Sequence, residues 1–339
     1  MEQVGQAAAH GQPPPQSTLN DLHRLAIERP LNWEPFLVQG AIALRNGDFA
    51  RAERLILSAR QRAPRSPAAR YLLAQTYLAS GHPAQAMTEM AVLNRLVPTA
   101  SVQLAPALAE YARTTPKALP EIRSMLASYP ELETPLLAKL SWDPANADLI
   151  LALANPKRSA GPPPDWQRLM LTTLVNNGQF DKAYTIWRKL ADVPDLRGGF
   201  YNPTFADTSA PPPFNWEFAH GAGGVAEASA NGLQVLYFGR DTVPLAAQVL
   251  LLPPGRYRIE ARIAGDVDAD AGIRWTAACL PSQATILSIP VTGPGSLSSE
   301  FVVPAGCAAQ RVTLGAEAPD VPSSSDFRVS ALQLTKVAS

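Results

Sequence analysis

Two cysteines are the only residues of their type in the 339-residue chain, and their oxidation is the clearest chemistry that the sequence offers. Cys279 and Cys307 both fall in the C-terminal part, which suits a disulfide within one domain. Closing a loop of about 29 residues would stabilise that domain by about 3–4 kcal/mol in the chain-entropy picture. A disulfide would indicate an oxidising compartment, the periplasm or cell envelope, whereas two free thiols would indicate the cytoplasm. Two cysteines without paired histidines are too few for a zinc site.

Three carboxylates alternate at Asp266, Asp268 and Asp270, in a segment expected to connect two strands. Oxygen ligands at this spacing can converge on Ca²⁺. The segment departs from an EF-hand loop, because Ala271 stands where glycine is needed and Ala277 where glutamate is needed. We therefore expect a solvated acidic hairpin and no metal, with calcium as the alternative.

The residue types of known catalytic sites are present but not arranged as such sites require. The four histidines are scattered: His10, His23, His82 and His220. The sequence has no phosphate-binding loop, nucleophile elbow or dinucleotide fingerprint, and no pair of carboxylates is marked out as acid and base. It therefore predicts no enzymatic activity and no cofactor; an enzyme with an unrecognised site is the competing hypothesis.

Composition sets limits on the partners. The formal net charge is zero, and neither half of the chain carries the dense Lys/Arg stripe of a nucleic-acid surface. No stretch approaches the roughly 18 apolar residues that a membrane helix needs. Residues 1–16 are predicted to be a disordered leader, 17–194 a helical domain and 195–339 a β-domain. The excess of Arg over Lys, with many Ala and Pro residues, is typical of a GC-rich bacterial gene.

Residues 33–66 and 67–100 repeat each other at a fixed interval of 34 residues. Small residues and a proline recur at matched positions: Gly40 and Ala74, Gly47 and Gly81, Ala52 and Ala86, Pro64 and Pro98. A period of this length predicts stacked helix–turn–helix units. Beyond residue 100 the pattern weakens, because Thr115 replaces the turn glycine and Pro120 the packing alanine. We expect a helix over 17–29, a shortened helix after Pro120, a short helix pair over 132–154 and a recovered repeat over 164–197.

These units resemble the tetratricopeptide repeat. The matching residues are Trp33, Gly40, Gly47, Phe49, Ala52, Ala59 and Pro64 in the first unit and Ala74, Tyr77, Gly81, Ala86 and Pro98 in the second. The resemblance implies an α-solenoid whose first helices line a groove for a protein partner. It places these residues in the groove: Leu37, Ala41, Leu44, Arg45, Tyr71, Gln75, Leu78 and Arg113. Their apolar character suits a helix or an extended apolar peptide; a neighbouring part of the chain or a second protomer is the alternative occupant.

After Pro194 the helical periodicity stops, and short apolar runs alternate with turns rich in Gly and Pro. The candidate strands are 199–205, 214–218, 232–239, 245–252, 256–264, 272–280, 284–289, 299–303, 311–316 and 327–335. Residues 256–263 alternate charged and apolar side chains, as a half-buried antiparallel strand does. Roughly eight to ten strands in about 140 residues predict a β-sandwich with jelly-roll topology.

The opening of this region, Asn202-Pro203-Thr204-Phe205 followed by Pro213-Phe214-Asn215-Trp216, resembles jelly-roll carbohydrate-binding modules of the galactose-binding-like kind. The resemblance spans roughly 199–337 and implies glycan binding, in which rings stack on sugars and polar side chains fix hydroxyls. The glycan-binding candidates are Tyr237, Arg240, Asp241, Arg274 and Trp275. Alternation in 272–277 also fits Trp275 as a core residue, and residues 239–241 also fit a plain surface turn.

Taken together, these patterns predict a non-catalytic bacterial cell-envelope adaptor. Its helical groove would bind a protein partner, and its sandwich would bind glycan during assembly, export or retention of a surface polysaccharide. The alternative is a protein–protein interaction scaffold whose sandwich is structural and binds no sugar.

Overall fold

The computed structural model describes residues 16–97, 99–155, 162–321 and 323–337 as two compact units. The first unit contains the helices from α2 to α10. The second contains α11, α12 and the β-sandwich, together with residues 141–144. The leader expected over residues 1–16 lies outside the described residues, apart from Gln16. Within the described ranges, no helix combines the length and apolar character needed to cross a bilayer.

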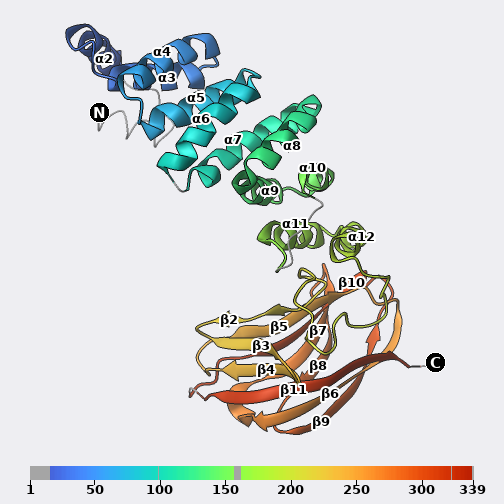
Figure 1. Cartoon of the computed structure of the whole chain (residues 1–339). Coiled ribbons are helices and arrows are strands. Elements are labelled where there is room, and N and C mark those ends of the chain that lie inside the picture. The colour runs from blue at the N-terminus through green and yellow to red at the C-terminus, as the bar shows by residue number, and fades with distance from the viewer. Residues whose placement is uncertain (1–15, 98, 156–161, 322, 338–339) are drawn as a thin grey trace. The chain divides into compact units, whose positions relative to one another are not determined.

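The first unit begins with antiparallel helix pairs, as the 34-residue period predicts (Figure 1). The helices are α2 (Gln16–Glu28), α3 (Glu34–Arg45), α4 (Phe49–Arg62), α5 (Pro67–Ala79) and α6 (Pro83–Leu96). Side chains of Asp48 and Ser66 cap α4 and α5 by accepting backbone N–H bonds. Gly47 and Gly81 both have φ of +77° in the turns between helices, a conformation that favours glycine. The two repeats therefore share the backbone conformation of their inter-helix turns as well as their sequence pattern.

The third repeat departs from this pairing where the sequence pattern weakens. Its helices are α7 (Ala100–Thr114) and α8 (Leu119–Ser128), separated by a 3-10 turn, η1 (Pro116–Ala118). Pro120 lies in the first turn of α8, which is shorter than α4 or α6, as expected. A further 3-10 turn, η2 (Pro130–Leu132), leads to α9 (Glu133–Leu140), and η3 (Pro144–Asn146) precedes α10 (Ala147–Leu153). The main packing partner of α7 is α9 rather than α8.

A last helix hairpin, α11 (Asp165–Asn176) and α12 (Phe180–Ala191), belongs to the compact unit of the sandwich. The hairpin expected over 164–197 is present, with Gly178 at φ +72° in its turn. The ring of Trp187 is buried against Tyr184, Tyr201 and Phe214, and its Nε1 donates a hydrogen bond to the carbonyl of Pro211 at 2.9 Å. The division at residues 194 and 195 stays a prediction, although the compact unit of the sandwich starts before α11.

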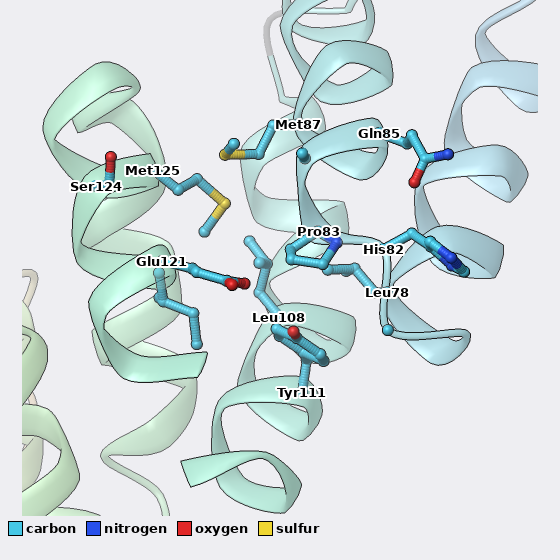
Figure 2. A pocket seen from close by; sticks show the side chains of 13 residues that line it. Leu78, His82, Pro83, Gln85, Met87, Leu108, Tyr111, Glu121, Ser124 and Met125 are labelled. Carbon is cyan, nitrogen blue, oxygen red and sulfur yellow. The ribbon is translucent and has the colours of Figure 1, made fainter. Parts of the chain in front are cut away.

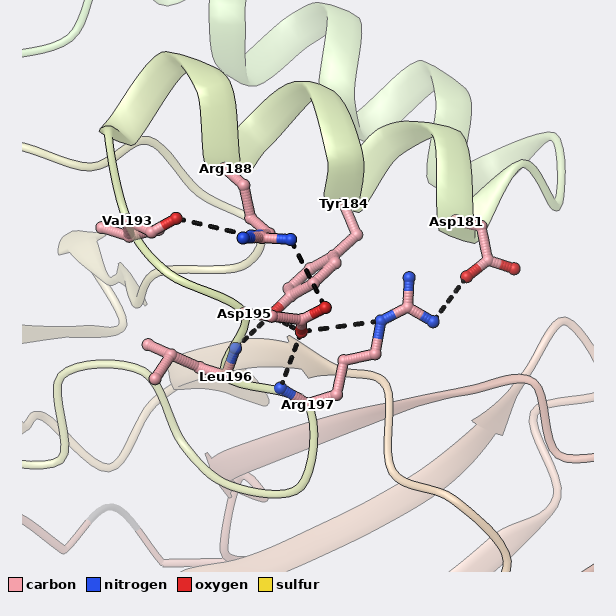
Figure 3. A network of polar contacts seen from close by, with 7 residues as sticks. All are labelled: Asp181, Tyr184, Arg188, Val193, Asp195, Leu196 and Arg197. Atoms are coloured by element: carbon pink, nitrogen blue, oxygen red, sulfur yellow. Dashed lines mark hydrogen bonds and ion pairs between the residues drawn. The ribbon is translucent and has the colours of Figure 1, made fainter.

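The segment that leaves α12 is held against that helix by a polar network (Figure 3). The Asp195 carboxylate accepts hydrogen bonds from the Tyr184 hydroxyl at 3.3 Å and from Arg188 at 3.4 Å. Arg197 reaches back to Asp181 at 2.8 Å, and the Leu196 N–H donates to the Tyr184 hydroxyl at 2.9 Å. These contacts fix residues 193–197 on the surface of α12.

The sandwich is built from two antiparallel sheets with jelly-roll topology. The five-stranded sheet has the order β1-β5-β10-β7-β8, and the six-stranded sheet has the order β2-β3-β4-β11-β6-β9. The strands are β1 (Glu217–Phe218), β2 (His220–Gly221), β3 (Gly224–Ser229), β4 (Gly232–Tyr237), β5 (Val243–Leu250), β6 (Gly255–Asp266), β7 (Arg274–Leu280), β8 (Thr285–Pro290), β9 (Gly295–Val303), β10 (Ala309–Ala316) and β11 (Ser325–Lys336). A short 3-10 turn, η4 (Ala269–Ala271), lies between β6 and β7.

Alternation places the core between the sheets. In β6, Tyr257, Ile259 and Ile263 are buried while Arg258 and Arg262 are exposed, as expected. Three details of the strand prediction are wrong, and one is that the two-residue strand β2 was not predicted. Residues 199–205 form no strand; they are a loop in which Phe205, at φ +63°, is buried beside Trp216. Strand β3 was missed because its sequence, GVAEAS, has only one β-branched residue.

Candidate functional site

The first helices of successive repeats, α3, α5 and α7, line a pocket of 370 Å³, with α3 and α7 each in contact with α5. Three predicted groove residues, Leu44, Gln75 and Leu78, lie in its wall. The remaining wall is Ala79, Gly81, Ala107, Glu110, Tyr111, Thr114 and Thr115. We call this pocket the groove pocket. Sequence reasoning missed Tyr111 as a lining residue, although the 34-residue offset from the aromatic Tyr77 marks it as a repeat position.

The other five predicted groove residues lie on the same helices but outside the groove pocket. Tyr71 is hydrogen-bonded to a residue of the pocket wall. Its hydroxyl accepts a hydrogen bond from Gln75 Nε2 at 2.8 Å and donates one to the Gln103 carbonyl at 3.4 Å. Leu37 and Ala41 are half-buried on α3, and Arg45 is exposed at its end. Arg113 is exposed and pairs with Glu110 at 2.5 Å.

The wall of the groove pocket combines a tyrosine hydroxyl with apolar and hydrogen-bonding side chains. Burial raises the pKa of Tyr111, and the nearby Glu121 carboxylate raises it further, so this hydroxyl stays protonated at neutral pH. Leu44, Leu78 and Ala107 supply apolar surface, while Gln75 and Thr114 supply hydrogen-bonding groups. Such a wall fits an apolar segment of polypeptide whose backbone needs a few polar contacts.

A second pocket, of 480 Å³, opens between the second helices α6 and α8 (Figure 2). It shares Leu78, Gly81 and Tyr111 with the groove pocket, so the two pockets are neighbours. We call it the rear pocket.

In the sandwich, two of the predicted glycan-binding rings are core residues. Tyr237 and Trp275 are each 0 % exposed, so neither ring offers a face on which a sugar can stack. Trp275 packs against Trp216 in the core, and the Tyr237 hydroxyl lies within hydrogen-bond distance of the Asp241 and Glu317 carbonyls. The expectation of sugar stacking on these two rings is therefore wrong.

The polar glycan candidates are at the surface. Arg240 and Asp241 are exposed in the loop after β4, and Arg274 pairs with Glu317 at 3.5 Å. Phe238, which sequence reasoning missed, begins that loop with 39 % of its surface exposed. Because successive strand residues point to opposite faces, burial of Tyr237 turns Phe238 outward. The structure thus brings an exposed ring into the loop of Arg240 and Asp241.

In the acidic triplet, Asp266 ends β6, Asp268 caps η4 and Asp270 lies within η4. Asp268 accepts a hydrogen bond from the Asp270 N–H at 2.8 Å and so begins η4. The nearby Ser323 hydroxyl and the hydrogen bond from the Asp270 N–H hold the pKa of Asp268 below its ordinary value. Across the described ranges, no group of three or more His, Cys, Asp or Glu side chains is arranged to hold a metal ion.

The two cysteines are joined as the sequence suggested. The sulfur atoms of Cys279 and Cys307 are 2.08 Å apart, and the disulfide lies among buried residues of the sandwich. It links the end of β7 to the turn before β10. The free-thiol alternative is not what the structure contains.

Comparison with known proteins agrees with the helical part. Residues 43–111 match the family model of the tetratricopeptide repeat. No curated protein matches the chain. Among solved structures, the chain is similar to YrrB, described as a TPR protein with an unusual peptide-binding site, at 15 % identity over 50 % of this chain and 91 % of YrrB, with a TM-score of 0.27.

Two carbohydrate-binding domains are also similar. The C-terminal CBM6 of LamC, a laminarinase of Zobellia galactanivorans, has 17 % identity over 35 % of this chain and 93 % of its own, with a TM-score of 0.24. The N-terminal cellulose-binding domain of β-1,4-glucanase C from Cellulomonas fimi has 20 % identity over 43 % and 99 %, with a TM-score of 0.27. At these scores the likeness carries no argument about ligands. The helical repeats over residues 43–111 are tetratricopeptide-like, in a chain that continues into a jelly-roll β-sandwich.

Proposed function

We propose that this protein is a non-catalytic adaptor whose helical repeats bind a segment of a partner protein in the groove pocket. The observation that carries the proposal is the 370 Å³ pocket formed by three successive first helices. Its wall combines apolar side chains with Gln75 and Thr114, which suits a peptide anchored by an apolar residue. A pocket of this size accepts one or two such anchors rather than a whole folded surface.

A selection experiment tests this function. Random peptides displayed on phage are selected on the immobilised full chain and on the variant Ala79→Arg. Ala79 is exposed and lines the groove pocket, so arginine there obstructs the pocket without entering the core. Ala68→Arg is the matched control, because Ala68 is exposed on the same helix and lies outside the pocket wall. Apolar peptides should be enriched on the wild type and on Ala68→Arg and depleted on Ala79→Arg; equal enrichment on all three contradicts the proposal.

A second binding role, for glycan, is favoured by one observation in the sandwich. Phe238 is an exposed ring in the same loop as Arg240 and Asp241. A ring for stacking and charged groups for hydroxyls are the parts that a sugar site needs. Calorimetric titration of the full chain with acidic and neutral polysaccharides tests it. Phe238→Ala should abolish binding. Val302 is also exposed but lies on β9, so Val302→Ala should leave binding unchanged. No heat of binding with any polysaccharide would favour a sandwich with a purely structural role.

The setting proposed for this adaptor is the bacterial cell envelope, where it would serve the assembly, export or retention of a surface polysaccharide. Support comes from the Cys279–Cys307 disulfide, since such bonds persist in oxidising compartments. Thiol labelling of unreduced protein taken directly from its native cells reports the state of both cysteines. Unlabelled cysteines agree with the envelope, and quantitative labelling would place the protein in a reducing compartment.

A further inference from the structure

The rear pocket has the walls of a binding site for a long, flexible side chain. Figure 2 shows Met87 of α6 and Met125 of α8 on one side and Leu108 and Tyr111 of α7 on the other. Methionine side chains adapt to the shape of an apolar occupant because they are unbranched and polarizable. The pocket therefore accepts aliphatic groups of more than one shape.

One exposed carboxylate, Glu121, lines this pocket and has no ion-pair partner among the described residues. In Figure 2, the Glu121 side chain points from α8 towards Pro83 and Leu108. Within the described part of the chain it has no hydrogen-bond or ion-pair partner, whereas Glu110, which lines the groove pocket, pairs with Arg113. The helix dipole favours a carboxylate in the first turn of a helix, which explains why Glu121 is tolerated at this position of α8. The dipole does not explain why the side chain points towards the pocket. Its influence reaches the buried Tyr111, whose pKa is raised by burial and then by this charge.

We infer that the rear pocket binds a lysine or arginine side chain of a protein partner, with Glu121 as the counter-charge. The aliphatic stem would lie along Pro83 and Met87, the half-buried apolar residues of the wall, and the cation would meet the carboxylate. An acidic residue would face Glu121 and be repelled, and a purely aliphatic one would leave that carboxylate partly desolvated and unpaired. The inference deepens the proposed function, on which it rests, by naming the chemistry of the partner's anchor.

Methionine methyl NMR tests this pocket separately from the groove pocket. The chain has five methionines, so ¹³C-methyl labelling gives a spectrum simple enough to assign by substitution. Met87 and Met125 line the rear pocket; Met90 is 0 % exposed and Met170 belongs to the other unit, so both are internal controls. The full chain is titrated with hexylammonium, hexanol and hexanoate, which share a six-carbon stem and differ in charge.

The expected result is a saturable shift of the Met87 and Met125 signals, with hexylammonium binding at least about fivefold more tightly than hexanol and hexanoate not binding. Glu121→Gln should remove the preference for the cation, and Ala79→Arg should leave it intact. Equal binding of the amine and the alcohol, or no shift at Met87 and Met125, overturns the inference. Either failure leaves the peptide selection on the groove pocket untouched, so the two proposals fail separately.

Discussion

Gly40 of α3 lies so close to Ile56 of α4 that a Cβ atom on Gly40 would be 2.5 Å from the Cγ1 atom of Ile56. The same two positions in the next repeat are Ala74 and Met90, both fully buried. Isoleucine is branched at Cβ and methionine is not, so the second repeat has room for the alanine methyl group. The space between the paired helices therefore explains why glycine is paired with isoleucine in one repeat and alanine with methionine in the next.

Gly40→Ala should lower the free energy of unfolding of the helical repeats by about 1–2 kcal/mol, because overpacking outweighs the better helix propensity of alanine. In an Ile56→Met background the same change should be neutral or stabilising, since glycine costs about 1 kcal/mol in a helix interior. Urea unfolding followed by far-UV circular dichroism on the four members of this double-mutant cycle measures the coupling. Additive effects would show that Ile56 is not what excludes a side chain at position 40.

The helix hairpin α11–α12 should be energetically part of the sandwich unit. Trp187→Ala removes the hydrogen bond to Pro211 and the ring contacts with Tyr201 and Phe214, and should cost about 3–5 kcal/mol. Trp187→Phe keeps a ring in the site and should cost less than half as much. Thermal unfolding followed by near-UV circular dichroism compares the two. Equal costs would mean that the ring contacts carry no stability.

Removal of the Cys279–Cys307 disulfide should destabilise the sandwich through the unfolded state. With a sequence separation of 28 residues, the double variant Cys279→Ala, Cys307→Ala should lose about 3–4 kcal/mol of unfolding free energy. Chemical denaturation with and without dithiothreitol measures it. The reductant should lower the stability of the wild type by a similar amount and leave the double variant unchanged. A reductant effect on the variant would point to a cause other than this bond.

Low pH should lower the free energy of unfolding of the sandwich unit through protonation of Asp207, which lies in the loop before β1. Burial by itself would raise the pKa of Asp207, but hydrogen bonds from the Ser209 and Tyr201 hydroxyls and from the Ser209 and Ala210 N–H groups hold it below its ordinary value of 3.8. A lowered pKa in the folded state means that the stabilisation is present above the ordinary value and is lost as the pH falls through the folded value.

The measurement is the unfolding free energy between about pH 5 and pH 2 for the wild type and Asp207→Asn. The wild type should lose stability more steeply with falling pH, because the variant has no charge to protonate at this position. Parallel curves for the two proteins would show that Asp207 does not titrate differently in the folded and unfolded states.

The architecture was predictable because it follows from periodicity. The 34-residue spacing of Gly47 and Gly81 placed the helix turns, and alternation in residues 256–263 placed a strand face. Periodicity also identified the weak point at Thr115 and Pro120. Periodicity did not predict the rear pocket beside Glu121. That pocket depends on how α7, α8 and α9 pack, and the packing of α7 on α9 is a tertiary contact that no local sequence pattern encodes.

The glycan candidates illustrate the limit of alternation. A period of two says that Tyr237 and Phe238 face opposite ways, but it does not say which of them faces the second sheet. The choice depends on the position of β4 between β3 and β11, a long-range pairing with residues near 327. Trp275 was uncertain for the same reason, and its place on β7 opposite Leu314 puts it inside.

The central claim, that the groove pocket binds a protein segment, is tested most directly by one titration. A fluorescently labelled peptide from the selection is titrated with the full chain, Ala68→Arg and Ala79→Arg, and fluorescence anisotropy gives the Kd of each. The account predicts one saturable site, unchanged in Ala68→Arg and weakened at least about tenfold in Ala79→Arg, a loss of about 1.4 kcal/mol. The same Kd for Ala79→Arg as for the wild type would contradict it.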